Sequence, residues 1–457
     1  MAYLNWKTGF SIAATVGALS LSGAAYGQTL SQSLVTALTT SPALEINRAA
    51  LRSLDEGVIQ ARAGKRPQVS ATGSASLTDR EGGNATEAYR ATLNASLLLF
   101  DGGRTDAAVQ SAHAAIDAAE AQFDNVVQSV ILTAITAFVD VRRDERFVAL
   151  AQNNVRVISQ QVAAARDRFE VGEVTRTDVS QAEARLASAR SNLSSNRGGL
   201  ERSRQAYLAA VGQPVKKLST PPALPKLPRT LDQALAIGMR EHPSLKSAQA
   251  NITGAEFDLL RAKSGRKPSL TLNGSLDYND NVQTSGTSAT LSLSGNLPIY
   301  QGGSISSLVR QAQSILDRRK AELVDAARTV QQDVALSWAN LNVARSSIVA
   351  SRQEIRAAKL AFDGVREEAK LGARTTLDTL DAEQDVLNAE SGLAAALRDE
   401  YVAAYNLIFS MGMLSPDYLN LGVNATDRRV ISGGQAQASV LSRRASQVES
   451  IRRRWSN

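Results

Sequence analysis

The sequence of 457 residues contains no cysteine and only two histidines. Thiolate and imidazole groups are the main ligands of zinc and other soft metal ions, and cysteine also supplies disulfides and thiol nucleophiles. Disulfide scaffolds and thiol chemistry are therefore excluded, and soft-metal centres nearly so. The other residues show no nucleophile, metal-ligand or glycine-loop constellation either. We therefore expect no enzymatic activity, no cofactor and no bound metal.

Aromatic residues are also scarce, at 5%, while alanine is abundant, a mixture that favours closely packed helices over a bulky globular core. The formal net charge is +7, and the surplus is concentrated in a basic C-terminal tail, 423–457. No aromatic residues interleave with the basic ones, so a solvated or lipid-facing tail is favoured over nucleic-acid binding. The basic residues are Arg428, Arg429, Arg443, Arg444, Arg452, Arg453 and Arg454.

The chain is built from one unit used twice. Landmarks in the first half return about 200 residues later with one shared offset, which favours an internal duplication over chance. Five prolines stand between the halves. We therefore predict a first repeat over 28–213, a stiff linker over 214–228 and a second repeat over 229–422. The matched landmarks are Leu97–Gly103 with Leu297–Gly303, Phe169–Gly172 with Ala369–Gly372, and Thr177-Asp178 with Leu377-Asp378.

The first 27 residues have the pattern of a cleaved secretory signal peptide. Lys7 precedes a short apolar segment from Gly9 to Ala25, which is rich in small residues. An anchor helix is the alternative, but the segment is short and serine-rich for a membrane span. No cysteine follows, so lipid attachment through an N-terminal cysteine is chemically impossible. No later segment is predicted to be a transmembrane helix.

A helical pattern runs from Leu34 to about Gly64, interrupted at Ser41-Pro42, and the hydrophobic period then changes to two. Two alternating segments in each repeat predict four strands of about ten residues, long enough to cross a membrane when tilted. The loop of the first hairpin is predicted over Thr78–Ala88. The apolar positions are Val69, Ala71, Gly73, Ala75 and Leu77; Tyr89, Ala91, Leu93, Ala95 and Leu97; Leu270, Leu272, Gly274, Leu276 and Tyr278; and Ala289, Leu291, Leu293, Gly295 and Leu297.

This alternation allows two interpretations. The sheet could lie on a soluble core with its polar face in water, or it could be the wall of a transmembrane barrel that is apolar toward lipid. Two features favour the barrel: the neighbouring helices are too long to fold back over four strands, and lipid cannot satisfy two open sheet edges. Single-chain barrels start at eight strands, so we expect oligomerisation, and three copies would supply twelve strands.

Very long helices follow each hairpin. Apolar residues recur every three or four positions over 104–170 and 304–370, which predicts coiled-coil-like helices about 100 Å long. Return helices are predicted over 177–211 and 376–409, after short glycine-containing turns. Alanine on both flanks of the apolar seam fits the wall of a helical tube, although an ordinary antiparallel bundle has the same periodicity.

Several short motifs keep their order and offset in the two repeats. They are Phe100-Asp101-Gly102-Gly103, Tyr300-Gln301-Gly302-Gly303, Val171-Gly172-Glu173, Gly372-Ala373-Arg374 and Thr376-Leu377-Asp378-Thr379-Leu380-Asp381-Ala382. Together they resemble the TolC-like outer-membrane efflux proteins, up to about residue 420. The resemblance implies a homotrimer with a twelve-stranded β-barrel in the outer membrane and an α-helical tunnel through the periplasm. It also implies docking of the helix turns to a periplasmic adaptor protein and an inner-membrane pump.

The resemblance assigns a role to two acidic residues after the second turn. Asp378 and Asp381 lie three apart on one helix face and match the family's carboxylates at the periplasmic constriction. In a trimer they would form a ring of six carboxylates that favours cations. The alternative is that acids near a helix N-terminus merely cap it and favour its dipole.

The resemblance also assigns a closed-state latch. Arg374 matches an arginine that ties neighbouring turns to a threonine and an aspartate of the other repeat, here Thr177 and Asp178. The alternative is a solvated arginine. Ala369 stands where the family has an aromatic partner, so one latch contact is missing, and Leu371 replaces the usual valine. The turn residues that match adaptor contacts are Val171, Gly172, Glu173, Leu371 and Gly372.

The expected fold class is an internally duplicated α+β membrane protein, in which a long α-helical coiled-coil barrel is continuous with a β-barrel. The leading hypothesis is a passive outer-membrane exit duct of a tripartite efflux or type I secretion system, for drugs or secreted proteins. The alternative is a periplasm-spanning coiled-coil tether or adhesin without a lumen. Conductance in planar bilayers separates the two, because a tether would show none.

Overall fold

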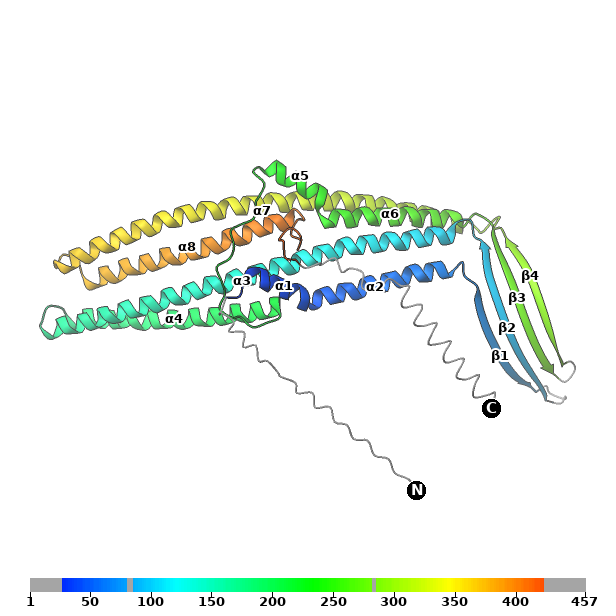
Figure 1. Cartoon of the computed structure of the whole chain (residues 1–457), viewed down its shortest axis with the longest axis horizontal. Coiled ribbons are helices and arrows are strands. Elements are labelled where there is room, and N and C mark those ends of the chain that lie inside the picture. Colours follow the sequence, from blue (N-terminus) through cyan, green and yellow to red (C-terminus); the bar gives the residue numbers. More distant parts are fainter. Residues whose placement is uncertain (1–26, 80–84, 282–284, 423–457) are drawn as a thin grey trace, which may run out of the picture.

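The structure is a computed structural model that describes residues 27–79, 85–281 and 285–422. The predicted signal peptide up to residue 26 and the predicted basic tail lie outside the described residues. The described chain is an elongated rod of helices, with a β-sheet at one end and two helix turns at the other (Figure 1). Two short helices, a β-hairpin, a long helix and a return helix occur twice in this order, which confirms the internal duplication.

The bounds of the elements agree closely with the periodicity of the sequence. The first repeat contains α1 (Leu30–Thr40), α2 (Pro42–Ala63), β1 (Gln68–Thr78), β2 (Thr86–Phe100), α3 (Arg104–Glu170) and α4 (Arg176–Val211). The second repeat contains α5 (Leu231–Glu241), α6 (Pro243–Ser264), β3 (Ser269–Asn281), β4 (Ser285–Asn296), α7 (Ser304–Lys370) and α8 (Thr376–Ser410). Both long helices have the predicted bounds, and each return helix differs from its prediction by one residue at one end.

Glycines allow each hairpin to pass directly into a long helix. Gly103 precedes α3 with φ of 87°, and Gly303 precedes α7 with φ of 85°. A β-carbon disfavours this left-handed conformation, so glycine is the residue that can make the turn without strain. Strand and helix are therefore joined by three residues in the first repeat, Asp101 to Gly103.

The four strands form one antiparallel sheet in the order β1-β2-β3-β4. Its register aligns the predicted apolar positions in rows: Leu93 of β2 pairs with Ala71 of β1 and with Leu276 of β3, and Leu276 pairs with Ala289 of β4. The predicted first hairpin loop was too long. The strand β2 already begins at Thr86, because the antiparallel ladder with β1 continues beyond the last alternating residues.

The two faces of the sheet differ in chemistry. On one face the apolar side chains are largely exposed, including those of Val69, Leu77 and Leu291. On the other face polar groups bond to each other, as Thr92 Oγ1 donates to Asp277 Oδ1 at 2.7 Å. The sheet extends beyond the end of the helices rather than lying on them (Figure 1). The interpretation of a sheet packed on a soluble core is therefore wrong.

The helices form a rod in which α3 is central. Helices α2, α4, α6 and α8 all pack against α3, with α2 nearer the sheet and α4 nearer the turns, whereas α7 contacts mainly α6 and α8 (Figure 1). One stretch of α3 is long and apolar enough to cross a membrane, which the sequence analysis did not expect. Half of that stretch is buried against other helices, as is usual for the core helix of a bundle.

The largest apolar core lies near the middle of the rod, where the repeats meet. Side chains from α1, α2, α3, α4, α5, α7 and α8 contribute to one cluster, and Phe123, Phe138 and Tyr207 are among its fully buried members. The connection between α4 and α5 crosses this region (Figure 1). Arg142 of α3 holds it by donating hydrogen bonds to the carbonyl oxygens of Leu218 and Ser219.

Candidate functional site

The end of the rod opposite the sheet consists of two tight turns, one from each repeat (Figure 1). Gly172 in the α3–α4 turn has φ of 81° and Gly372 in the α7–α8 turn has φ of 78°, the left-handed conformation that ends many helices. Beside them, the side chains of Val171 and Leu371 are 71% and 86% exposed. Glu173 is exposed as well. The residues predicted to contact an adaptor therefore lie at the tip of the rod, with two apolar side chains in solvent.

Both return helices begin with the same capping box. At the start of α4 the Asp178 carboxylate accepts a hydrogen bond from the Thr175 N–H at 2.9 Å, and Thr175 Oγ1 accepts from the Asp178 N–H. At the start of α8, Asp378 and Thr375 repeat both bonds, at 2.9 and 3.2 Å. The Thr375 backbone and side-chain bonds hold the pKa of Asp378 below its ordinary value. Asp378 thus fills the capping role that the sequence analysis held as the alternative.

The predicted latch residues are not bonded to each other within one chain. Arg374 Nε donates to Glu368 Oε2 at 2.8 Å, inside its own turn, and this ion pair raises the pKa of Arg374. Thr177 is exposed, and the Asp178 carboxylate serves the α4 cap. Within the described part of one chain, no hydrogen bond links Arg374 to either of them. The latch stays a prediction about contacts between neighbouring copies.

Asp381 has a partner that sequence analysis missed. Its Oδ1 accepts a hydrogen bond from Arg185 Nη2 at 2.5 Å, so the pair joins α8 of the second repeat to α4 of the first. Both side chains are about half exposed, and such a pair contributes less than about 1 kcal/mol to stability. Its more important effect is electrostatic, because Arg185 offsets the negative charge of a residue predicted to line the constriction.

Glu383 is a second polar group that sequence analysis missed. It lies on α8 between the apolar positions Leu380 and Leu387, and its Oε2 is buried without a hydrogen-bond partner in the described structure. Burial raises the pKa of its carboxyl group to about 7. The sequence did contain a signal for this residue. Glu383 follows Leu380 by three positions and precedes Leu387 by four, which places a carboxylate on the apolar face of the helix.

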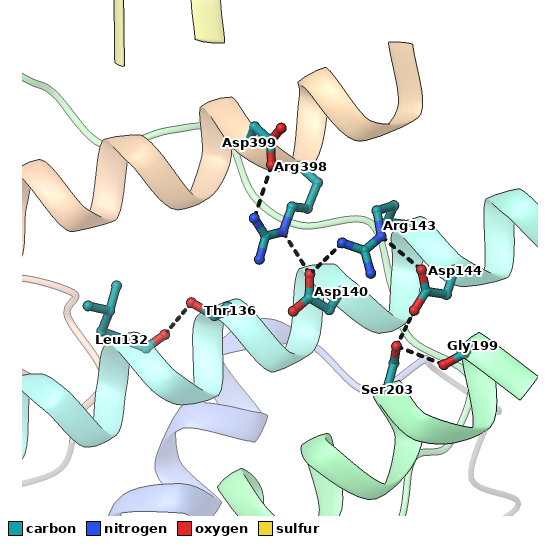
Figure 2. A network of polar contacts seen from close by, with 9 residues as sticks. All are labelled: Leu132, Thr136, Asp140, Arg143, Asp144, Gly199, Ser203, Arg398 and Asp399. Carbon is teal, nitrogen blue, oxygen red and sulfur yellow. Dashed lines mark hydrogen bonds and ion pairs between the residues drawn. The ribbon is translucent and has the colours of Figure 1, made fainter. Parts of the chain in front are cut away.

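Farther from the turns, a polar network joins three helices of the two repeats (Figure 2). Arg398 Nε of α8 donates to Asp140 Oδ1 of α3 at 2.7 Å, and Arg143 bridges Asp140 and Asp144. Ser203 of α4 donates to Asp144. These charge-assisted bonds fix α8 and α4 against α3, and so help to set where the two turns lie relative to each other.

The comparisons with known proteins agree with this architecture. The family model described as outer membrane efflux protein matches residues 34–213 and 233–413 of the chain. The chain belongs to this family. The two matched segments fall on the two repeats, which is further support for the duplication.

Relatives of this efflux-family protein extend over nearly the whole chain. The outer membrane efflux protein BepC of Brucella suis is 33% identical over 408 residues, which covers 88% of this chain and 89% of BepC. The outer membrane protein TolC of Escherichia coli is 28% identical over 438 residues, which covers 90% of this chain and 88% of TolC. The solved structure of the Campylobacter jejuni CmeC outer membrane channel has the same fold, with a TM-score of 0.73 at 17% identity, over 93% of this chain and 97% of CmeC.

Family membership confirms the predicted fold class, location and function. The efflux-family protein is an outer-membrane exit duct, with a helical barrel continuous with a β-barrel to which each chain adds four strands. The tether without a lumen is set aside, because the family consists of outer membrane channels. The fold also gives the bare apolar face of the sheet a partner, since that face lies against lipid in a membrane barrel.

Proposed function

We propose that the protein works as a homotrimer that conducts solutes passively, without chemistry of its own, from an inner-membrane pump to the cell exterior. The observation that carries this proposal is the four-stranded sheet with two unpaired edges, β1 and β4. Unpaired backbone groups are costly in lipid, so both edges require partners there. The edges belong to different strands, so β4 of one copy pairs with β1 of the next, and this head-to-tail association closes into a ring.

The number of copies follows from the need for a lumen. Strands alternate in direction across the sheet, so β4 of one copy lies antiparallel to β1 of the next, and every added copy preserves the pattern. Two copies would give eight strands, and the interior of an eight-stranded barrel is just filled by side chains. Three copies is therefore the smallest assembly that leaves a passage.

A cysteine cross-link tests the ring, because the natural chain has no thiol that could compete. Ala71→Cys on β1 is combined with Ala289→Cys on β4, and with neighbouring positions of β4 to sample the register. We expect oxidation of at least one pair to give a covalent trimer on a denaturing gel. Chains with cysteine at Leu93 of the central strand β2 should stay monomeric. Covalent products that stop at dimers, or form an open ladder, would refute the closed trimer.

The two exposed turns are proposed to dock a periplasmic adaptor protein, through which the inner-membrane pump is engaged. The support is the pair of apolar side chains, Val171 and Leu371, held in water at the tip by rigid turns. Relatives with lower coverage are named as secretion proteins, such as the protease secretion protein PrtF of Dickeya chrysanthemi. Replacing Val171 and Leu371 by aspartate should abolish copurification with a cross-linked adaptor. The control variant Ile46→Asp on α2 should still copurify with it. If the double variant also copurifies with the adaptor, the docking site is refuted.

The proposed constriction is formed by Asp378 and Asp381 of three copies. Its support is their position at the start of α8, next to the turns. The pairing of Asp381 with Arg185 and the capping by Asp378 mean that neither carboxylate is free to face a lumen in the single chain. The constriction therefore requires rearranged side chains in the trimer.

A further inference from the structure

The connection from a strand into a long helix occurs once in each repeat, and the two connections differ in what covers them. Gly102 lies between β2 and α3 and is buried, whereas Gly302 lies between β4 and α7 and is exposed. Both have positive φ, at 66° and 57°, so the two turns have similar backbones. The side chain of Tyr300 is 87% exposed, against 50% for its counterpart Phe100. The first connection is therefore covered within the chain, and the second is not.

The cover of Gly102 comes from the connection between α6 and β3. Lys267 Nζ donates a hydrogen bond to the Gly102 carbonyl oxygen at 2.9 Å, and Ser264 Oγ donates a second at 3.2 Å. A β-carbon at Gly102 would lie 2.5 Å from the Lys267 Cβ, too close for two non-bonded carbons. A β-carbon at Gly302 would meet no atom within 4 Å. Glycine at 102 thus lets a second segment approach the turn, and glycine at 302 would permit the same approach.

The segment that covers Gly102 has a counterpart in the first repeat. Helices α2 and α6 both have 22 residues, and each is followed by a glycine, two basic residues and a proline. The first of these basic residues contacts the long helix of its own repeat. In the first repeat Lys65 Nζ lies 2.5 Å from Asp106 Oδ1, and in the second Arg266 Nη2 donates to Ser306 Oγ at 3.2 Å. The two segments therefore have equivalent positions in their repeats.

The second basic residue is the one that differs between the repeats. Lys267 bonds to Gly102 of the preceding repeat, but Arg66 belongs to the first of the two described repeats. Arg66 is exposed, and its guanidinium makes no hydrogen bond or ion pair within the part of the chain that the structure describes. The Gly302 carbonyl oxygen accepts no hydrogen bond from the described residues either. A donor and an acceptor thus each lack the partner that their counterparts have.

We propose that Arg66 of one copy donates a hydrogen bond to the Gly302 carbonyl oxygen of the neighbouring copy. The contact repeats, between copies, the bond that Lys267 makes to Gly102 within each chain. It rests on the proposed ring, because pairing of β4 with β1 of the next copy brings the β4–α7 connection beside the α2–β1 connection. A guanidinium has five N–H donors, so it can reach the carbonyl oxygen in several orientations.

The contact fixes how neighbouring copies align along the sheet. Two strand edges can pair in several registers, because a shift of two residues keeps every side chain on its own face. A charge-assisted hydrogen bond at the junction of sheet and helices favours one of these registers. Arg66 is the side-chain donor expected there, because Ala63 stands where the second repeat has Ser264.

Paired cysteines test the contact directly. The chain with Arg66→Cys and Gly302→Cys, oxidised in a maltoside detergent, should run as a covalent trimer on a denaturing gel. The matched pair Lys267→Cys with Gly102→Cys should oxidise within one chain, without a gain in mass, once the β-carbons separate by about 1 Å. If the first pair stays monomeric while the β1–β4 cysteines give a trimer, the contact is overturned and the ring stands. If neither gives a trimer, both are overturned.

Substitution of Arg66 measures the contribution of the hydrogen bond. Arg66→Gln should raise the dissociation constant of the trimer by at least about tenfold, because a hydrogen bond from a charged group is lost at each interface. Arg66→Lys should restore most of the affinity, because Lys267 makes the same bond within the chain. Arg52→Gln removes an exposed arginine of α2 and should change nothing.

Sedimentation in lipid-free maltoside detergent reports these dissociation constants. Wild-type affinity of the Arg66→Gln variant would overturn the proposal. A loss of affinity that appears only after anionic phospholipid is added would overturn it too, and would assign Arg66 to lipid headgroups.

Asparagine at three glycines gives a measurement that leaves Arg66 in place. Asparagine tolerates positive φ better than most residues, so it tests the space around each turn. Gly102→Asn should lower the melting temperature of the monomer, because Lys267 occupies that space. Gly302→Asn should weaken the trimer and leave the monomer nearly unchanged. Gly303→Asn should do neither, because a β-carbon there, or at its counterpart Gly103, meets no atom within 4 Å. Equal assembly of the Gly302→Asn and Gly303→Asn variants would overturn the proposal.

Discussion

The two long helices occupy the same place in the two repeats and have the same length, yet their surroundings differ. Of the 67 residues of α3, 21 are buried, whereas only six of the 67 residues of α7 are. Large apolar side chains are exposed along α7, with Leu336 at 54% and Val343 at 64%, while on α3 Phe169 near the turn is the exposed example. Helix α3 is thus the core helix of the chain, whereas α7 lies at its surface with large apolar side chains in solvent.

This difference teaches how a duplicated unit can specify an assembly. Periodic apolar residues are present on both helices, so α7 has the pattern of a packed helix without enough packing partners in its own chain. Exposed apolar area of this kind marks an interaction surface. The side of the rod that α7 leaves open and the free edge of β4 belong to the same repeat, as the proposed head-to-tail association of copies requires.

The largest effect on stability is expected in the central core, where α3 is buried. Phe138→Ala removes a fully buried ring from the central core and should lower the free energy of unfolding by about 3–5 kcal/mol. Leu336→Ala on α7 should change the stability of the monomer by less than about 0.5 kcal/mol. Thermal unfolding of monomers in detergent, followed by circular dichroism, measures both. Equal losses would mean that α7 is no more exposed than α3.

The next effect concerns the exposed apolar side chains of α7. Val343→Asp places a charge in the proposed contact between copies and should raise the dissociation constant of the trimer by at least about tenfold, because an unpaired charge cannot be buried cheaply. Val343→Thr, with nearly the same shape, should give a smaller shift. Sedimentation of both variants reports the assembly state. Unaltered assembly of the aspartate variant places Val343 outside the interface.

The contact between the repeats should also depend on pH through Glu383. The pKa of this acid is raised from 4.5 to about 7 on folding, so the folded state resists its ionisation. The free energy of unfolding is therefore highest below about pH 4.5. It decreases as the pH rises from about 4.5 to about 7 and is constant above about 7. The loss is on the order of 1–2 kcal/mol, after allowance for partial solvent exposure.

Melting temperatures at pH 5 and pH 8 measure this loss. Glu383→Gln should lessen the difference between the two temperatures, and Asp385→Asn should preserve it. A Glu383→Gln variant with the wild-type pH dependence would assign the effect to other acids of the chain.

The two turns offer a fourth comparison, because Arg374 has Val174 as its counterpart in the first repeat. If Arg374 latches neighbouring copies, Arg374→Ala should increase the conductance of the channel in planar bilayers. Glu368→Gln, which removes the partner seen within the chain, should then have little effect on conductance. Unchanged conductance of the Arg374→Ala channel removes the latch assignment. Equal increases in conductance for both variants would attribute the effect to the Arg374–Glu368 pair within the turn rather than to a contact between copies.

The smallest expected effect concerns the constriction. Asp381→Asn should lower the preference of the channel for cations, and Arg185→Gln should raise it, because Arg185 offsets the charge of Asp381. Reversal potentials in a salt gradient measure both. Identical potentials for the two variants and the wild type would place Asp381 away from the conducting path.

Local periodicity was sufficient for most of the fold. The bounds of α3 and α7 follow from uninterrupted spacing of apolar residues between glycine turns, and the four strands follow from alternation. The start of β2 was missed by a few residues, because the ladder between β1 and β2 extends past the alternating residues and depends on pairing rather than on either strand alone. The capping role of Asp378 was visible in the sequence as an alternative, since the Thr-x-x-Asp spacing is local.

Contacts between the repeats could not be predicted in the same way. Arg185 and Asp381 are 196 positions apart, and they meet only because α4 and α8 pack with one particular rotation about their axes. The same holds for Asn154 and Glu383, which belong to different repeats and line one cavity. A one-residue change in rotation moves a helical side chain by about 100°, so periodicity identifies the buried face but not its partner.

The direct passage from strand to helix sets the perimeter of the protein. Each strand continues into one helix, because α2, α3, α6 and α7 adjoin β1, β2, β3 and β4. A tilted strand occupies about 6–7 Å of a barrel's circumference, whereas helices pack 8–10 Å apart. A helical tube with one helix per strand must therefore be wider than the barrel it joins, unless its helices approach at the short end of that range. Alanine along the flanks of the long helices permits this approach, so the smallest apolar side chain allows two rings of unequal natural width to share a single wall.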